Sequence, residues 1–142
     1  MSKYLFNIPP KIKRYIEYEL EHFNENKRWL KETEDNMMPG ITPVLSFTGG
    51  GGGIKKPTEK AAIKIASSIY IRRTEENIRA LERVLGRLDS TDKTLIELVY
   101  FRKTHTVIGA GLKVNLDKSA AYRHINNIIG LIALEMGLIT HD

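Results

Sequence analysis

Residues 90–129, STDKTLIELVYFRKTHTVIGAGLKVNLDKSAAYRHINNII, decide the expected fold, because they predict three helices with a tight turn between the last two. Ser90 is expected to cap the first helix, whose apolar block runs from residue 95 to residue 101. Residues 106–113 predict a short second helix, which two glycines weaken. After a turn at 114–116, Asp117 is expected to cap a long last helix over 118–136, which Gly137 closes.

This order of elements is that of a helix-turn-helix, in which the second helix packs closely against the third. Gly111 supplies the small residue that such packing needs. Ala121, Ile125 and Ile128 follow one another at spacings of four and three residues, so they share one face of the last helix. We expect this face to point inward, in a compact helix-turn-helix domain over residues 89–142.

The opposite face of the last helix carries side chains that can contact DNA bases, since arginine pairs with guanine and asparagine with adenine. The expected base-reading residues are Lys118, Ser119, Tyr122, Arg123 and Asn126. Backbone amides, hydroxyl groups and basic side chains near the start of a helix often hold phosphates. The expected phosphate contacts are Lys103, Thr104, His105, Thr106 and Lys113. The alternative is a plain helical bundle whose last helix is amphipathic.

The first 88 residues predict two long helices. No proline or glycine interrupts residues 11–38, and the apolar residues there fall on one stripe, which predicts a helix over about 10–38. Pro57 opens a second helix that is expected to reach Leu88 and has a wide apolar face. We therefore expect an all-α chain: a long antiparallel helical hairpin, followed by the three-helix unit. Helices of this length need a partner helix or a second subunit, so a homodimer is a further expectation.

The segment between the two long helices, residues 39–56, contains five consecutive glycines, Gly49 to Gly53. Such a run loses much backbone entropy on ordering, which predicts a flexible linker. A phosphate-cradling loop is not favoured, because no Gly-Lys-Ser/Thr ends the run and no strand precedes it.

Composition limits the class of protein. The 142 residues are 42% apolar and include no cysteine, which excludes disulfides, thiolate zinc sites and a cysteine nucleophile. We expect a cytoplasmic protein without a signal peptide or membrane span. Residues 55–88 hold nine Lys or Arg against four Glu, so the net charge of +5 lies on the second long helix. That basic helix is either a solvated face or a surface that attracts phosphates.

An enzyme is the weakest interpretation. Glu17, Glu21 and Glu25 are four residues apart, with His22 beside them, and acids at this spacing can in principle bind a metal. On a long helix rich in Lys and Arg they are more often a solvated face. We therefore expect no catalytic residues, no metal and no cofactor.

Six blocks in order along the chain resemble the RinA/ArpU family of phage and prophage transcriptional regulators. These blocks are Tyr15 to Leu20 (YIEYEL), Gly49 to Gly53, Ala80 to Leu88 (ALERVLGRL), Leu95 to Phe101 (LIELVYF), Asp117 to Arg123 (DKSAAYR) and Ile132 to Leu138 (IALEMGL). One departure is Ala110-Gly111, where the family usually has Ile-Ala.

The C-terminal part of that family looks like region four of bacterial sigma factors. The resemblance implies a phage- or prophage-encoded, double-stranded DNA-binding protein that activates late phage genes with host RNA polymerase, in the cytoplasm of the bacterial host. An alternative from another class is a phage small-terminase-like DNA-packaging protein, or another oligomeric structural protein. Such proteins also join a helix-turn-helix to long oligomerising helices.

Overall fold

The computed structural model describes residues 5–36 and 57–140, and every regular element in these two ranges is helical. The predicted all-α class is therefore confirmed. The elements are α1 (Pro10–Glu21), α2 (Phe23–Asn36), α3 (Pro57–Leu85), α4 (Ser90–Ile96), the π-helical turn η1 (Glu97–Phe101), α5 (Val107–Lys113) and α6 (Lys118–Glu135). The predicted linker, residues 39–56, lies outside the described residues.

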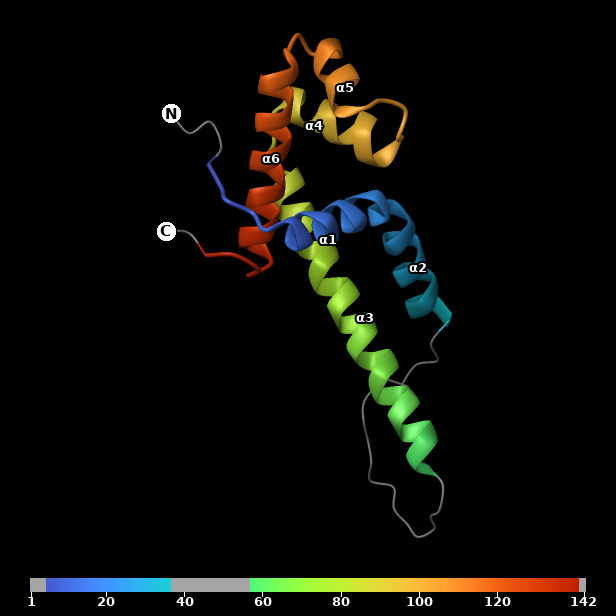
Figure 1. Ribbon diagram of the computed structural model, residues 1–142. Coiled ribbons are helices and arrows are strands. Elements are labelled where there is room, and N and C mark those ends of the chain that lie inside the picture. Colours follow the sequence, from blue (N-terminus) through green and yellow to red (C-terminus); the bar gives the residue numbers. More distant parts are fainter. Residues whose placement is uncertain (1–4, 37–56, 141–142) are drawn as a thin grey trace.

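The helices are arranged around α6 and the C-terminal half of α3 (Figure 1). α4 and α5 pack beside α6, and α1 crosses both α6 and η1. α2 then turns to run beside α3, while the N-terminal half of α3 extends beyond the other described helices. No helix in the described ranges has the length and apolar character that crossing a membrane requires.

One hydrophobic cluster joins residues from both sides of the predicted domain boundary at residue 88. Complete burial of an aliphatic side chain stabilises a fold by roughly 1.5–3 kcal/mol relative to exposure. The largest side chains that are fully buried come from α1, α3, α4 and α6, and they are Ile16, Leu20, Leu81, Leu95, Ile96, Ile125, Ile128, Ile129 and Ile132. Residues 1–88 and 89–142 thus share their core.

The prediction of one uninterrupted helix over residues 10–38 is wrong, because the chain bends at His22, where φ is −104° and ψ is 9°. The Nδ1 atom of His22 donates to the carbonyl oxygen of Tyr18 at 2.8 Å. The bend lets α1 and α2 pack on different helices. Leu20 on α1 is buried in the shared core, whereas the Trp29 ring on α2 meets the Tyr70 ring of α3 edge-on, with 5.3 Å between centroids.

The predicted long first helix is thus divided into α1 and α2, and only α2 runs antiparallel to α3. Lys27 forms an ion pair with Glu82 at 3.2 Å, and Trp29, which is later in the chain, meets the earlier residue Tyr70. The second long helix ends at Leu85, three residues before the predicted end. The amide of Arg87 bonds to the carbonyl of Val84 at 3.0 Å, a short-range bond that tightens and closes the last turn.

Two details of the first helix in the C-terminal unit differ from expectation. Its N-cap is Asp89 and not Ser90, because an Asp89 carboxylate oxygen accepts from the backbone N–H of Asp92 at 2.9 Å. The helix also continues as the π-helical turn η1, in which the amide of Arg102 donates to the carbonyl of Glu97 at 2.7 Å. This wider turn places Tyr100 in the core, where it is 3% exposed.

Candidate nucleic-acid interface

The candidate interface is built on α5, a short turn and α6. Thr106 caps α5, since its hydroxyl oxygen accepts from the amide of Gly109 at 3.1 Å. Asp117 caps α6 as predicted, accepting from the amide of Ala120 at 2.8 Å. Between the two helices Asn115 has φ 63°, a left-handed conformation that asparagine tolerates better than most residues. Local sequence signals therefore account for both helix starts and for the turn.

Close packing of α5 on α6 depends on Gly111. A Cβ atom at this position would lie 2.6 Å from the Cβ of Ala121 and 3.3 Å from the carbonyl oxygen of Leu116. Because ordinary contacts are 3.4–4 Å, no larger residue fits without moving the helices apart. The predicted inward face of α6 is confirmed, with Ala121, Ile125 and Ile128 all 2% exposed or less.

The predicted base-reading residues follow one side of α6 in its N-terminal half. Lys118 and Ser119 are exposed, Tyr122 is 38% exposed, and Arg123 is half-buried. Asn126 is also half-buried, and its Nδ2 atom donates to the backbone carbonyl of Phe6 at 3.3 Å. Its amide group is thus already used to hold the N-terminal segment. This leaves the first turn and a half of α6 as the accessible part of the predicted surface.

The predicted phosphate contacts lie around the start and the end of α5. Thr104 and His105 are hydrogen-bonded to each other between Oγ1 and Nδ1 at 2.8 Å. The backbone amides of both residues donate to the carbonyl of Leu98, at 3.0 and 3.3 Å, so those amides serve the fold. Lys103, with φ 57°, and Lys113 at the end of α5 are exposed cations. The exposed cations of this group therefore flank α5 on both sides.

Contacts between the N-terminal segment and α6 were missed in the sequence. The amide of Leu5 donates to the side-chain oxygen of Asn127 at 3.1 Å. Phe6 lies against Gly130, where an added Cβ would overlap the phenyl ring. The signal that could have indicated this contact is Gly130 itself, because a glycine in mid-helix often marks a close approach of another segment.

His124 is the second residue whose role appears only in the structure. Its Nδ1 atom lies 2.7 Å from a carboxylate oxygen of Asp92, and both side chains are partly buried. This contact joins α6 to α4 on the side away from Lys118 and Tyr122. His124 is thus a packing residue that holds α6 against α4.

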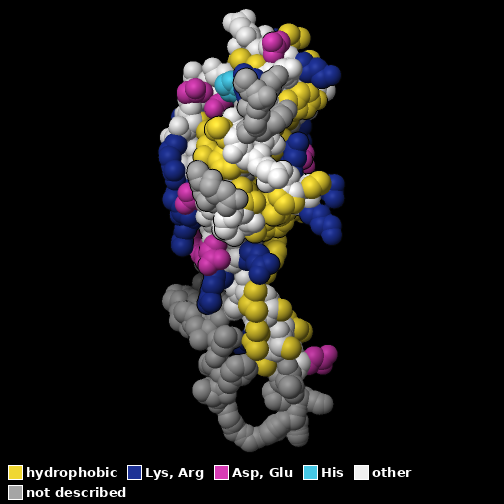
Figure 2. All heavy atoms as spheres, turned by 60° about the vertical axis from the view of Figure 1, so that its left-hand side comes forward, with side chains coloured by type: hydrophobic (Ala, Val, Ile, Leu, Met, Phe, Trp, Pro, Cys, Tyr) yellow, Lys and Arg dark blue, Asp and Glu magenta, His cyan; other side chains and the backbone are white. Residues whose placement is uncertain are grey.

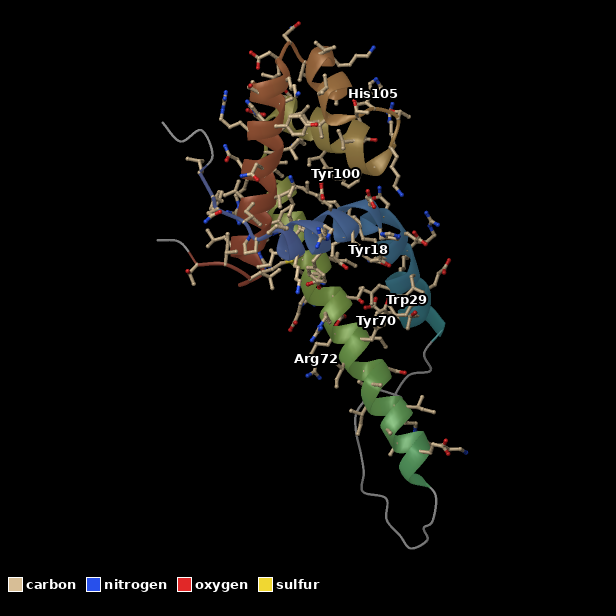
Figure 3. The ribbon with its side chains drawn as sticks, in the orientation of Figure 1. Tyr18, Trp29, Tyr70, Arg72, Tyr100 and His105 are labelled. Carbon is tan, nitrogen blue, oxygen red and sulfur yellow. The ribbon has the colours of Figure 1, made fainter. Side chains whose placement is uncertain are left out.

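The basic helix lies away from the start of α6. Arg83 and Arg87 contact Glu135 at 2.6 and 3.3 Å, at the C-terminal end of α6, and the hydrogen bond from Arg83 lowers the pKa of Glu135. Figure 3 shows Arg72 farther still from His105. An α6 of 18 residues is about 27 Å long at 1.5 Å per residue. The described basic residues of α3, from Lys60 to Arg83, therefore lie away from the start of α6, toward the other end of the molecule.

Two of the four residues considered as metal ligands, Glu17 and His22, have other contacts. A Glu17 carboxylate oxygen accepts from the hydroxyl of Tyr100 at 2.7 Å. Burial, together with this bond, raises the pKa of Tyr100, so the phenol remains a donor. The ring of His22 stacks on Tyr18 with 4.0 Å between centroids. Within the described ranges, no three His, Asp or Glu side chains come together as a metal site.

Comparisons with protein-family models, with curated proteins and with solved structures give no match for this chain.

Proposed function

We propose that this chain is a sequence-specific DNA-binding regulator that places the N-terminal half of α6 in the major groove. The observation that supports this most is the contact between Gly111 and Ala121. It brings α5 close to α6 and leaves Lys118, Ser119 and Tyr122 exposed beyond the contact. A recognition helix in a helix-turn-helix reads bases with residues of this N-terminal part.

The resemblance to phage and prophage regulators extends the proposal to late-gene activation with host RNA polymerase. On this proposal Lys118, Ser119, Tyr122 and Arg123 contact base edges, while Lys103 and Lys113 contact phosphates on either side. Asn126 contributes less to base contacts, because its side-chain amide donates to the backbone carbonyl of Phe6. On this proposal the protein binds DNA and recruits host RNA polymerase, and it performs no catalytic step.

The test starts with selection of preferred duplexes from a random double-stranded DNA pool by the full chain. Fluorescence anisotropy then measures affinity for the selected duplex and for a scrambled duplex at several salt concentrations. We expect Arg123→Ala to cost about 1–3 kcal/mol on the selected duplex and to reduce discrimination. Lys113→Ala should weaken both duplexes and lower the salt slope by about one, because it removes a phosphate contact.

Arg79→Ala is the matched control, since it removes an exposed cation from α3 far from the interface. Far-UV circular dichroism should be unchanged for all three variants. The proposal fails if the wild-type chain selects no sequence. It also fails if Arg79→Ala and Arg123→Ala have equal effects on discrimination.

A second candidate is the small-terminase-like or other oligomeric structural protein. The observation that favours it is the N-terminal half of α3, which extends beyond the other described helices and exposes Ile63, Ile69 and Tyr70. Mass measurement in solution separates the two candidates. A ring of many subunits indicates DNA packaging, whereas a monomer or dimer indicates a regulator.

A further inference from the structure

The N-terminal half of α3 has an apolar face that the described helices leave mostly exposed; α2 reaches it only at its C-terminal edge, where the Trp29 ring meets Tyr70. Ile63 is 62% exposed, Ile69 53% and Tyr70 56%, and Ala62 and Ala66 are also exposed. Figure 2 shows hydrophobic side chains following one another along this part of the helix. Several large apolar side chains gathered on one exposed face are a common mark of an interaction site.

The side chains along this face differ in charge and size in a regular order. At 3.6 residues per turn, the residues Glu59, Ala62, Ile63, Ala66, Ile69, Tyr70 and Arg73 share one stripe, which we call the α3 face. Ala66 lies at its centre. Glu59 and Arg73 are each seven residues away, about 10.5 Å in opposite directions along the helix. The α3 face thus has a small residue in the middle, an acid at one end and a base at the other.

We propose that the α3 face binds the α3 face of a second copy of this chain, antiparallel, with the two-fold axis beside Ala66. The symmetry brings Glu59 of each copy next to Arg73 of the other, because both are seven residues from the axis. It also places Ile63 next to Tyr70 of the second copy, and Ala62 next to Ile69 of the second copy. Ala62 then lies opposite the larger Ile69, Ala66 lies beside the axis, and each charge lies opposite its complement.

The charges select the antiparallel arrangement. In a parallel pair in the same register, Glu59 would face Glu59 and Arg73 would face Arg73, and both contacts would be repulsive. The two alanines Ala62 and Ala66 allow the helix axes to approach closely at the centre. A contact between two helix segments of this length falls in the smaller class of interfaces, so the dimer should dissociate on dilution.

The arrangement also determines where two recognition helices would lie, a consequence that rests on the proposed DNA binding. From Ala66 to Leu85, α3 spans 19 residues, or about 28 Å at 1.5 Å per residue. Figure 1 places the start of α6 beyond that end of α3. The two recognition helices would therefore be more than about 56 Å apart, which exceeds the 34–36 Å between adjacent half-sites on straight DNA. The dimer would connect two separate DNA sites.

Sedimentation velocity of the full chain without DNA, over a wide range of protein concentration, tests the dimer independently of DNA binding. We expect wild type to shift from monomer to dimer as concentration rises. Glu59→Arg and Arg73→Glu each place like charges at both ends of the α3 face, and each should weaken dimerisation by about tenfold or more. The double variant Glu59→Arg/Arg73→Glu restores both pairs with their signs exchanged, so it should dimerise like wild type.

Lys64→Glu is the control, because it reverses a charge on the exposed opposite side of α3 and should leave dimerisation unchanged. Circular dichroism verifies that each variant remains helical. A chain that stays monomeric at all concentrations, or that forms a ring of many subunits, overturns the proposal. A dimer that both single variants leave intact, or that the double variant does not restore, overturns it as well.

Discussion

Gly111→Ala and Gly109→Ala make the same chemical change two residues apart on α5, and they should have opposite effects on stability. Replacing a helical glycine by alanine favours the helix by about 1 kcal/mol. At Gly109 the new Cβ would lie 3.3 Å from the Thr106 hydroxyl oxygen and no closer than 3.8 Å to His105, contacts that small shifts relieve. We expect Gly109→Ala to leave the free energy of unfolding unchanged or to raise it by up to about 1 kcal/mol.

At Gly111 the new Cβ would lie 2.6 Å from the Cβ of Ala121, about 1 Å inside an ordinary contact of 3.4–4 Å. A Cβ atom cannot rotate away, so α5 and α6 must separate. Overpacking of this kind costs about 1–3 kcal/mol, which exceeds or cancels the helical gain. We expect Gly111→Ala to lower the free energy of unfolding by up to about 2 kcal/mol.

A double-mutant cycle with Ala121→Gly isolates the contact, because the helix propensities of the two positions cancel in it. In the Ala121→Gly background the opposing Cβ is absent, so Gly111→Ala should become neutral or stabilising. The coupling between the two substitutions should be about 1–3 kcal/mol. Urea unfolding followed by circular dichroism at 222 nm supplies the four free energies, with equal m-values as the check on comparability.

Additive effects within about 0.5 kcal/mol would refute the reasoning. Such a result would mean that α5 and α6 can separate at no cost, and that the glycine is not required for their approach. Equal effects of Gly109→Ala and Gly111→Ala would lead to the same conclusion.

Three further predictions concern other parts of the molecule. Burial raises the pKa of Glu19 above its ordinary value of 4.5, so the charged form opposes folding at neutral pH. Glu19→Gln should therefore increase stability at pH 7, and urea unfolding should show this gain disappearing as the pH falls below 4.5. Gly130→Ala should displace Phe6 from α6, and hydrogen exchange should then detect faster exchange at the amide of Leu5. Reversing Arg72 and Arg79 to Glu should change DNA affinity little at 0.1 M salt, where charges are screened over about 10 Å; a large loss would place the basic helix on DNA.

Much of the local structure could be predicted, because the signals are local. Asp117 as a cap, Gly137 at the end of the last helix, with φ 77°, and the inward face around Ile125 all follow from spacing and side-chain type. The cap at Asp89 shows the limit of such signals, since Asp89 and Ser90 are both good caps. Only the backbone geometry shows which of the two residues is the N-cap.

The face of α6 that carries the base-reading candidates could be predicted from spacing, but the exposure of each side chain on it could not. Lys118, Ser119 and Tyr122 are exposed as expected, whereas Asn126 is held by Phe6, a residue 120 positions earlier in the chain. No local pattern contains that contact. It depends on Gly130, whose missing side chain provides the space for the phenyl ring.

The sequence alone determined that this chain is helical, where most of its helices begin, and which face of α6 is buried. These properties depend on hydrogen bonds and side-chain periods within a few residues. Tertiary structure decided the bend at His22, the shared core of the two predicted domains, and the separation of the basic helix from the start of α6. The bend depends on distant surfaces that no local pattern contains, because it lets α1 pack on α6 and η1 while α2 packs on α3.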